Sequence, residues 1–299
     1  MTALSRLTLG TVQFGLPYGI ANRSGQPSYE TARDIIACAY EGGVNCLDTA
    51  AAYGESETVI GRALAELGLA DRMRVVTKVP PIPADLTGPA ADRFVATAVR
   101  KSLKALRHEK LYLCLFHREE DSGHIGSLVK LQEQGLIEQI GISTYRPHIT
   151  SEILTEGRVQ AIQIPTSILD QRFIRAGVLE QARQQGVTVF VRSVYLQGLL
   201  LMPPDRMDPF FAPVVELHPK LTQWAQKAGV SLAELAVRFV LSLEGASSLV
   251  LGMETIEQMR ENLRLCRRPP LPPDLLFDIL TDIPDLPDQL LMPPFWPKK

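Results

Sequence analysis

The chain has few cysteines and no pattern that would link them. Its 299 residues contain four, Cys38, Cys46, Cys114 and Cys266, and no C-x-x-C pair. Scattered cysteines in apolar segments behave as small buried hydrophobic residues, which is typical of reduced cytoplasmic proteins. The histidines also lack the spacing of metal ligands. The sequence therefore predicts neither a disulfide framework nor a metal site.

Long apolar runs and an excess of one charge are also missing. No stretch approaches the ~18 apolar residues of a membrane span, and the first ten residues lack the apolar core of a signal peptide. The net charge is −2, with acids and bases interspersed, so we expect neither nucleic acid nor a membrane as partner. These absences favour a cytoplasmic enzyme that acts on a small molecule, with a monomer as the plain expectation.

Short apolar runs alternate with amphipathic helical patterns eight times along the chain. Strands that alternate with helices form a parallel sheet through right-handed crossovers, and eight repeats favour closure into a barrel. No G-x-G-x-x-G follows any strand, so the phosphate-binding turn of a doubly wound dinucleotide fold is not expected. The sequence therefore predicts an α/β protein with a TIM (β/α)8 barrel. The predicted strands are Leu7–Gln13, Val44–Asp48, Arg74–Val79, Leu111–His117, Gln139–Ser143, Ala161–Pro165, Thr188–Ser193 and Ser248–Gly252.

No linker divides the chain, so residues 1–299 are expected to form a single barrel domain. Helix starts are marked by Ser28 and by capping boxes that open at Ser231 and Thr255. From residue 267 the composition changes, with nine prolines between residues 269 and 297. Residues 267–299 are therefore predicted to form an irregular C-terminal wrap or lid, with one short helix near Leu275–Leu280.

Four reactive side chains follow three neighbouring predicted strands. Asp48 and Tyr53 follow the second strand, Lys78 ends the third and His117 ends the fourth. The carboxyl ends of parallel barrel strands meet at one rim, so we expect these side chains to lie together. A lysine beside a phenol lowers the phenol pKa, a carboxylate fixes the lysine, and a histidine orients a carbonyl oxygen. The group is suited to protonate an oxyanion as hydride arrives at carbon.

Several segments give the chain a resemblance to the aldo-keto reductase superfamily over nearly its whole length. They are L-G-T-V-Q-F-G, D-T-A-A-A-Y-G-E-S-E, V-V-T-K-V, L-Y-L-C-L-F-H-R, I-G-I-S, Q-I-P, Q-G-L-L and Q-M-R-E-N-L. The resemblance implies a TIM barrel that binds an extended nicotinamide cofactor and reduces a small-molecule carbonyl substrate. It also implies that Asp48, Tyr53, Lys78 and His117 are the catalytic tetrad.

The same resemblance assigns the cofactor contacts. Residues matching Ser143 and Gln163 hold the carboxamide, and the adenosine end lies along Gly252 to Asn262, which includes Gln258. Family habit favours NADP(H). No base follows the last strand, however, and Glu254 suits the ribose hydroxyl of NAD(H) equally well. The helix opening near Thr255 is expected to offer free N–H groups to a phosphate.

The sequence departs from the family pattern at two cofactor positions. Thr144 stands where the family usually has asparagine, and Arg192 stands where an aromatic ring commonly stacks on the nicotinamide. Three more arginines, Arg118, Arg146 and Arg172, lie in loops after predicted strands. They suggest a basic rim and a substrate carrying phosphate, carboxylate or a nucleotide diphosphate. The alternative is that these arginines are solvated or paired with nearby carboxylates.

Specificity on this scaffold belongs to the loops and the tail, so Arg118 and Trp296 are further candidates for substrate contact. The leading interpretation is an NAD(P)H-dependent carbonyl reductase or alcohol dehydrogenase with Tyr53 as proton donor. A second is a barrel that retains the cofactor as a sensor or scaffold subunit with little turnover, suggested by Thr144 and Arg192. A third is a non-redox isomerase or epimerase of a phosphorylated sugar, with Lys78 or Tyr53 as base.

Overall fold

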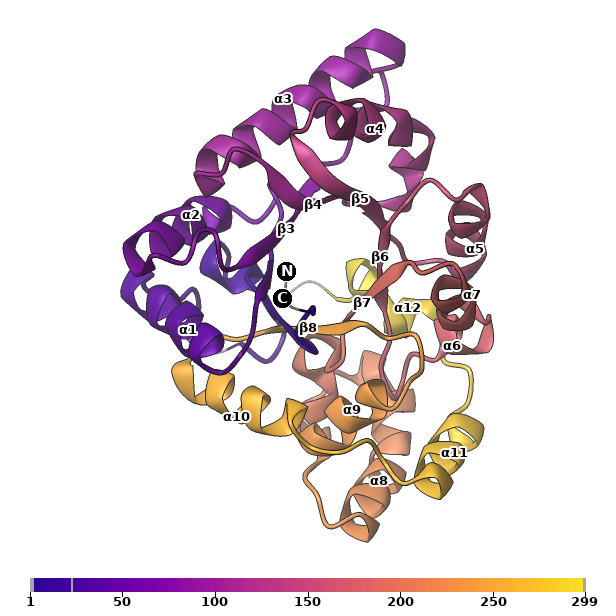
Figure 1. The fold of residues 1–299 in the computed structure, drawn as a ribbon. Coiled ribbons are helices and arrows are strands. Elements are labelled where there is room, and N and C mark those ends of the chain that lie inside the picture. The colour runs from indigo at the N-terminus through magenta and orange to yellow at the C-terminus, as the bar shows by residue number, and fades with distance from the viewer. Residues whose placement is uncertain (1–2, 23, 298–299) are drawn as a thin grey trace.

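The strands close into a single parallel barrel in a computed structural model that describes residues 3–22 and 24–297. Each strand pairs with the next in the sequence, and β8 pairs with β1 (Figure 1). The predicted TIM barrel is therefore confirmed. The strands are β1 Leu7–Gly10, β2 Cys46–Asp48, β3 Arg74–Val79, β4 Leu111–Phe116, β5 Ile137–Ser143, β6 Ala161–Pro165, β7 Thr188–Arg192 and β8 Ser248–Gly252.

Three of the predicted strands are longer than the observed ones at the carboxyl end. β1 stops at Gly10 because Val12–Phe14 forms a 3-10 turn, η1. β4 stops one residue before His117, and β7 stops before Ser193, whose φ of 64° lies in the left-handed region. These positions lie in the loops at the barrel mouth, beyond the last hydrogen bonds of the strand ladder.

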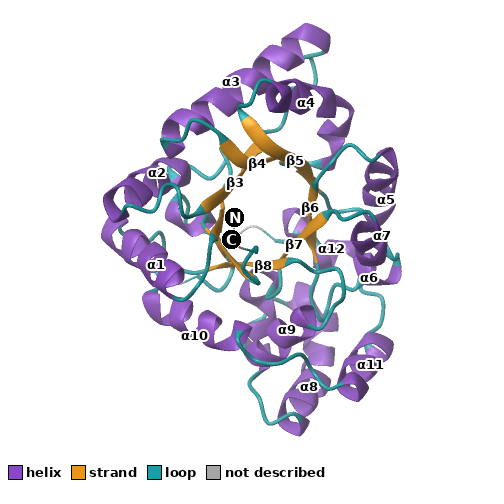
Figure 2. Ribbon diagram, viewed as in Figure 1, coloured by secondary structure: helices purple, strands orange, loops and turns teal. Residues whose placement is uncertain are grey.

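The helices lie outside the ring of strands, as Figure 2 shows. Their first turns are fixed by the predicted caps: Ser28, Ser231 and Thr255 each accept a hydrogen bond from the backbone N–H three residues later. The helices that cover the barrel are α1 Tyr29–Glu41, α2 Ser56–Leu67, α3 Gly88–Leu106, α4 Ile125–Glu133, α5 Pro147–Glu156, α6 Arg172–Arg175, α7 Val178–Gln184, α8 Ala212–Lys227, α9 Leu232–Leu241 and α10 Ile256–Cys266. None of the described helices is long and apolar enough to cross a membrane.

Apolar residues fill the barrel, while a larger apolar layer joins its outer face to the helices. The smaller core contains Cys46, Val76, Leu113, Leu115, Ala161 and Phe190, all fully buried. Cys46 and Cys114 are buried thiols, as predicted, and no cysteine of the described segments is in a disulfide. Because side chains fill the interior, the barrel is closed to ligands along its axis and chemistry is confined to its ends.

The proline-rich tail is more regular than the sequence suggests. It contains α11 Pro273–Asp282, the short helix α12 Asp288–Leu291 and a 3-10 turn at Pro293–Phe295, η6. The acids of this segment pair with bases of the barrel helices, namely Asp288 with Arg172, Asp285 with Arg175 and Asp282 with Lys220. The predicted short helix exists, and it is extended because Pro273 occupies its first turn, where proline is tolerated.

We predict that Gly61→Ala destabilises the barrel although alanine favours helix. A Cβ at Gly61 in α2 would lie 2.3 Å from the Ala105 carbonyl oxygen of α3. This clash should outweigh the ~1 kcal/mol gain in helix propensity and lower the free energy of unfolding by about 1–3 kcal/mol. The matched control is Gly126→Ala in α4, whose Cβ would meet only the flexible Arg158 side chain at 3.4 Å. Urea unfolding should show a lower free energy of unfolding for Gly61→Ala and no decrease for Gly126→Ala. Equal free energies for the two variants would contradict the packing argument.

Candidate active site

The four predicted catalytic residues meet at the carboxyl end of the barrel. Lys78 of β3 donates to both carboxylate oxygens of Asp48 at the end of β2, at 2.9 and 2.8 Å. Its Nζ lies 5.1 Å from the centre of the Tyr53 ring, and the Tyr53 and His117 rings meet edge to face with centroids 5.5 Å apart. Three consecutive strands and the loops after them thus bring an ion pair, a phenol and an imidazole close together.

The Lys78–Asp48 ion pair is buried, with 1% and 5% of the two side chains exposed. Lys78 also donates to the Thr49 carbonyl oxygen at 2.8 Å, and Gln163 Nε2 of β6 donates to Asp48 at 2.7 Å. Every charge at this position therefore has several partners, which a buried ion pair needs if it is to be tolerated. The sequence assigned Gln163 to the cofactor and gave no sign that its amide N–H would bind the catalytic carboxylate.

The loop that carries Tyr53 is fixed by buried hydroxyls and by a glycine. Ser56 Oγ lies 2.9 Å from both Thr11 Oγ1 and Thr49 Oγ1, so the loops after β1 and β2 are joined. A Cβ at Gly15 would lie 1.8 Å from the Tyr53 carbonyl oxygen, so only glycine allows this approach. Sequence reasoning missed these positioning residues, although Gly15 lies in the L-G-T-V-Q-F-G segment.

Burial controls the protonation states of Tyr53 and Lys78. It raises the pKa of the Tyr53 phenol, and the Asp48 carboxylate raises it further. Burial lowers the pKa of Lys78, an effect that Asp48 opposes. Burial is the largest influence on the pKa of Tyr53 and raises it, so the lowering expected from Lys78 does not dominate. Tyr53 consequently keeps its proton at neutral pH, as a proton donor must before it reacts.

His117 is neutral at physiological pH. Burial lowers its pKa from 6.5 to about 3, and the nearby charges of Lys78 and Arg192 act in the same direction. Its Nδ1 is buried and has no hydrogen-bond partner within the described chain. A neutral imidazole carries one N–H donor, so His117 is suited to bond a carbonyl oxygen without delivering a full charge.

Two further features at this end fit an extended polar ligand. Gln13 Oε1 is buried without a partner in the described segments, and Gln13 packs against the backbone of Gly252 at the end of β8. Buried polar atoms are normally satisfied, so an unpaired oxygen here marks a place for a donor on a ligand. Asn262 of α10 is buried, and its Oδ1 accepts from Tyr195 at 3.1 Å, which leaves its amide N–H groups for a ligand.

The start of α10 differs from the expectation of free N–H groups. Thr255 caps the helix, Gln258 closes a capping box, and Gln258 Nε2 donates to the Glu254 carboxylate at 2.9 Å. The pKa of Glu257 is lowered by hydrogen bonding of its carboxylate to its own backbone N–H and to Thr255. The predicted opening for a phosphate is therefore occupied by the side chains of the helix itself, with two carboxylates beside it.

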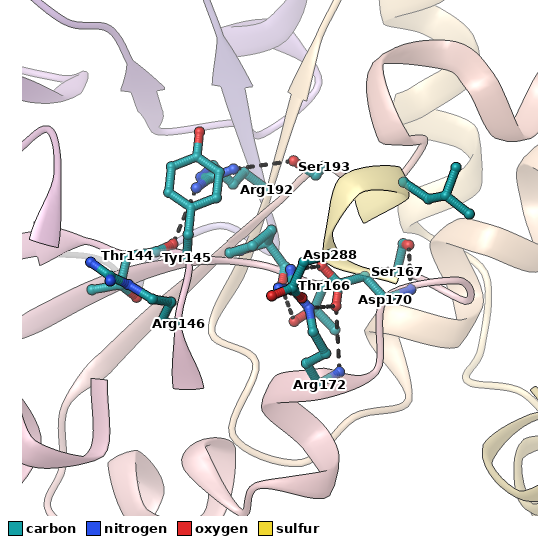
Figure 3. Close-up of polar contacts among 12 residues, drawn as sticks. Thr144, Tyr145, Arg146, Thr166, Ser167, Asp170, Arg172, Arg192, Ser193 and Asp288 are labelled. Carbon is teal, nitrogen blue, oxygen red and sulfur yellow. Dashed lines mark hydrogen bonds and ion pairs between the residues drawn. The ribbon is translucent and has the colours of Figure 1, made fainter. Parts of the chain in front are cut away.

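The predicted basic rim is largely neutralised. Arg118 bonds Asp121 through two nitrogens, Arg146 pairs with Glu119 and Glu120, and Arg172 pairs with Asp170 and Asp288. Each pairing arises because a loop carboxylate lies within reach, a relation that strand spacing does not show. Figure 3 shows Arg172 with its two partners, and Arg192 beside the Tyr145 ring with bonds to Ser193 and Thr144.

Ser143, Thr144 and Trp296 are also buried at this end of the molecule. Ser143 ends β5 and is the residue that the sequence assigned to the carboxamide of the cofactor. Thr144 is fully buried, and its hydroxyl accepts from Thr150 at 2.8 Å, so its carbonyl is the group that reaches Arg192. Trp296 packs edge to face on Phe211, and its indole N–H donates to the Leu290 carbonyl. This tryptophan therefore has its polar atom satisfied within the tail.

Comparison with known proteins gives this geometry a family. A model of the aldo/keto reductase family matches residues 6–279. The chain belongs to that family. Its members use NAD(P)H, and the protein is accordingly an oxidoreductase of carbonyl or alcohol groups.

The family relatives are distant. The chain is 24% identical to "L-glyceraldehyde 3-phosphate reductase" of Escherichia coli K12 and 26% identical to "NADH-specific methylglyoxal reductase" of the same strain. These alignments cover 87% of this chain, and 85% and 89% of the relatives. The holo form of aldo-keto reductase AKR11C1 from Bacillus halodurans superposes with a TM-score of 0.79 at 24% identity, covering 95% and 93% of the two chains. That last likeness shows the fold.

We predict that Lys78→Met lowers the free energy of unfolding by about 3–5 kcal/mol, because Asp48 is left as a buried charge without its cation. The double variant Asp48→Leu/Lys78→Met should recover much of that loss, since no buried charge remains. Chemical denaturation of the two proteins measures the difference. If the double variant were as unstable as the single one, the loss would come from packing and not from the unpaired carboxylate.

A second prediction concerns pH. The unfolded chain binds a proton at His117 near pH 6.5, whereas the folded chain does so near pH 3. Stability should therefore fall as pH drops through this window, by at most about 1.4 kcal/mol per pH unit from this residue. His117→Gln does not titrate, so its stability should fall less steeply than that of the parent between pH 7 and pH 4. Parallel slopes in urea titrations would refute the assignment.

Proposed function

We propose that the protein reduces a small polar aldehyde or ketone with NADH, or oxidises the corresponding alcohol, using Tyr53 as the proton donor. The observation that carries the proposal is the contact of Tyr53 with both Lys78 and His117 around a buried carboxylate. The names of the two Escherichia coli relatives, which act on small oxygenated carbonyl compounds, support this substrate class.

The side chains divide the work as follows. Ser143 and the amide oxygen of Gln163 would hold the carboxamide of a nicotinamide cofactor, which would supply hydride to the carbonyl carbon. His117 donates a hydrogen bond to the carbonyl oxygen and fixes its position. Tyr53 gives its proton to that oxygen as negative charge develops, and the cation of Lys78 stabilises the phenolate that remains. Asp48 holds Lys78 in place through two hydrogen bonds.

NADH is favoured over NADPH by the residues around α10. Family habit favours NADP(H), but the capping side chains occupy the helix start, and Glu254 and Glu257 would repel the 2′-phosphate. The Glu254 carboxylate would instead accept a hydrogen bond from the free 2′-hydroxyl of NADH. The name of the methylglyoxal reductase records the same cofactor choice in one relative. Arg260 is exposed on the same helix and is the residue that a phosphate would need to recruit.

We predict that Tyr53→Phe reduces turnover by about 10²–10⁴-fold, the usual contribution of a positioned acid or base. The variant should still bind NADH, because only a hydroxyl is lost. Steady-state reduction of methylglyoxal and fluorescence titration with NADH measure the two properties. The matched control is Tyr29→Phe on α1, whose hydroxyl bonds Glu66 on the outer surface and which should keep full activity. Full activity in the Tyr53 variant would remove its role as proton donor.

A further prediction concerns the cofactor. The protein should bind NADH more tightly than NADPH. Glu254→Gln should reduce this difference in affinity, because it removes a negative charge beside the ribose 2′ position of the cofactor. Parallel titrations of both proteins with both cofactors test this expectation. Tighter binding of NADPH by the unmodified protein would show that the phosphate finds a cation, and Arg260→Gln would then identify whether that cation is Arg260.

A further inference from the structure

Arg192 differs from the other arginines at the mouth of the barrel. Arg118, Arg146 and Arg172 each have at least one carboxylate partner, whereas no ion pair joins Arg192 to a carboxylate of the described residues. Its two bonds are to neutral oxygens, the Thr144 carbonyl at 3.1 Å and the Ser193 hydroxyl at 3.3 Å. A half-buried cation without a counter-charge is costly, so its retention here calls for a partner that the chain does not supply.

The guanidinium is held in a fixed orientation. Its carbon lies 4.1 Å from the centre of the Tyr145 ring, and the two bonds to Thr144 and Ser193 use one N–H from each terminal nitrogen (Figure 3). A guanidinium has five N–H donors, so about three remain for a ligand. A planar guanidinium that is already stacked and hydrogen-bonded binds a carboxylate or phosphate with little further loss of conformational entropy.

Arg192 also lies close to the catalytic group. Its positive charge lowers the pKa of His117 and opposes protonation of Lys78, so its field reaches both residues. The charges of Lys78 and Asp48 offset each other, and His117 and Tyr53 are neutral. The charge of Arg192 is therefore not balanced by the tetrad. Tyr18, whose hydroxyl accepts from Gln197 at 2.8 Å, is a second donor near the same mouth and is influenced by the same cation.

We infer that Arg192 binds an anionic group, a phosphate or a carboxylate, carried by the carbonyl substrate. The inference rests on the proposed reductase function and specifies its substrate class. It replaces the expectation of a broadly basic rim with one cation, because the other three arginines are already paired. The anion would lie between the Tyr145 shelf and the tetrad, so the substrate would be a short chain with its charge a few atoms from the reacting carbon.

Matched pairs of substrates test the inference. Glyceraldehyde and glyceraldehyde 3-phosphate differ by a phosphate, and butanal and succinic semialdehyde differ by a carboxylate. The protein should prefer the charged member of at least one pair in kcat/KM, and the pair that shows the preference identifies the anion. Arg192→Gln should reduce that preference tenfold or more, mainly through a higher KM for the charged member. Arg192→Lys should retain part of it, because charge remains and the fork is lost.

Two controls separate this result from other effects. Arg100→Gln removes one positive charge from the exposed side of α3 and should leave the preference unchanged. NADH titration of Arg192→Gln shows whether cofactor binding has changed. If the variant binds NADH more weakly and loses activity equally on both members of each pair, Arg192 serves the cofactor and the inference is wrong.

A binding measurement keeps the inference testable if none of these carbonyls is turned over. Calorimetric titration with glycerol 3-phosphate and with 4-hydroxybutyrate, which are the alcohol products, should show binding of at least one by the parent protein in the presence of NAD+. Arg192→Gln should weaken that binding tenfold or more. Equal binding by parent and variant, or none by the parent, would overturn the inference. Absence of turnover with normal anion binding would instead count against the reductase function.

Discussion

The ion pair between Lys78 and Asp48 is the interaction on which the site depends. It joins the ends of two neighbouring strands where almost no solvent reaches, so each charge is stable only because the other is present. The two charges sum to nearly zero, and burial together with the Asp48 carboxylate raises the pKa of Tyr53. The same balance makes Arg192 conspicuous, since its positive charge is the one at the mouth that the described carboxylates leave uncompensated. A single pairing thus determines both which group holds the proton and where an incoming anion is attracted.

The sequence was sufficient for the fold and for the proximity of Asp48, Tyr53, Lys78 and His117, because both follow from repetition and from the order of the strands. Apolar runs alternating with capped helices predict a barrel, and Asp48, Lys78 and His117 follow from the rule that parallel strands share one rim. Ser28, Ser231 and Thr255 cap helices as predicted, since an N-cap is a local interaction over three residues. Strand ends were less accurate, because the alternating pattern of Val12, Gln13 and Phe14 resembles a strand while the backbone forms a 3-10 turn.

Interactions between loops could not be predicted from the sequence in the same way. The pairing of Arg118 with Asp121 spans three residues, yet whether both side chains turn toward each other depends on the local 3-10 turn. Gln163 reaches Asp48 across 115 positions of sequence, and Arg172 reaches Asp288 across 116. The start of α10 is another case. The Gln258 side chain accepts from the Glu254 backbone N–H and donates to the Glu254 carboxylate, and the sequence does not show which acceptor each N–H bonds. The proximity of the four side chains was therefore predictable from the sequence, whereas the hydrogen-bond partners of the loop residues were not.

The attachment of the tail has a consequence for how the molecule responds to its medium. Backbone ladders and apolar side chains close the barrel, and dissolved ions have little effect on either. The segment from α11 to α12 is joined to the barrel helices by pairs whose acids are largely exposed, with 83% of Asp285 and 60% of Asp288 accessible. Such pairs weaken as ionic strength rises, because the Debye length shrinks to about 8 Å near physiological salt and further above it. Concentrated salt would thus weaken these ion pairs and leave the tail held by its buried apolar residues, such as Leu275, Ile279 and Leu291, which pack into the same core as the barrel helices.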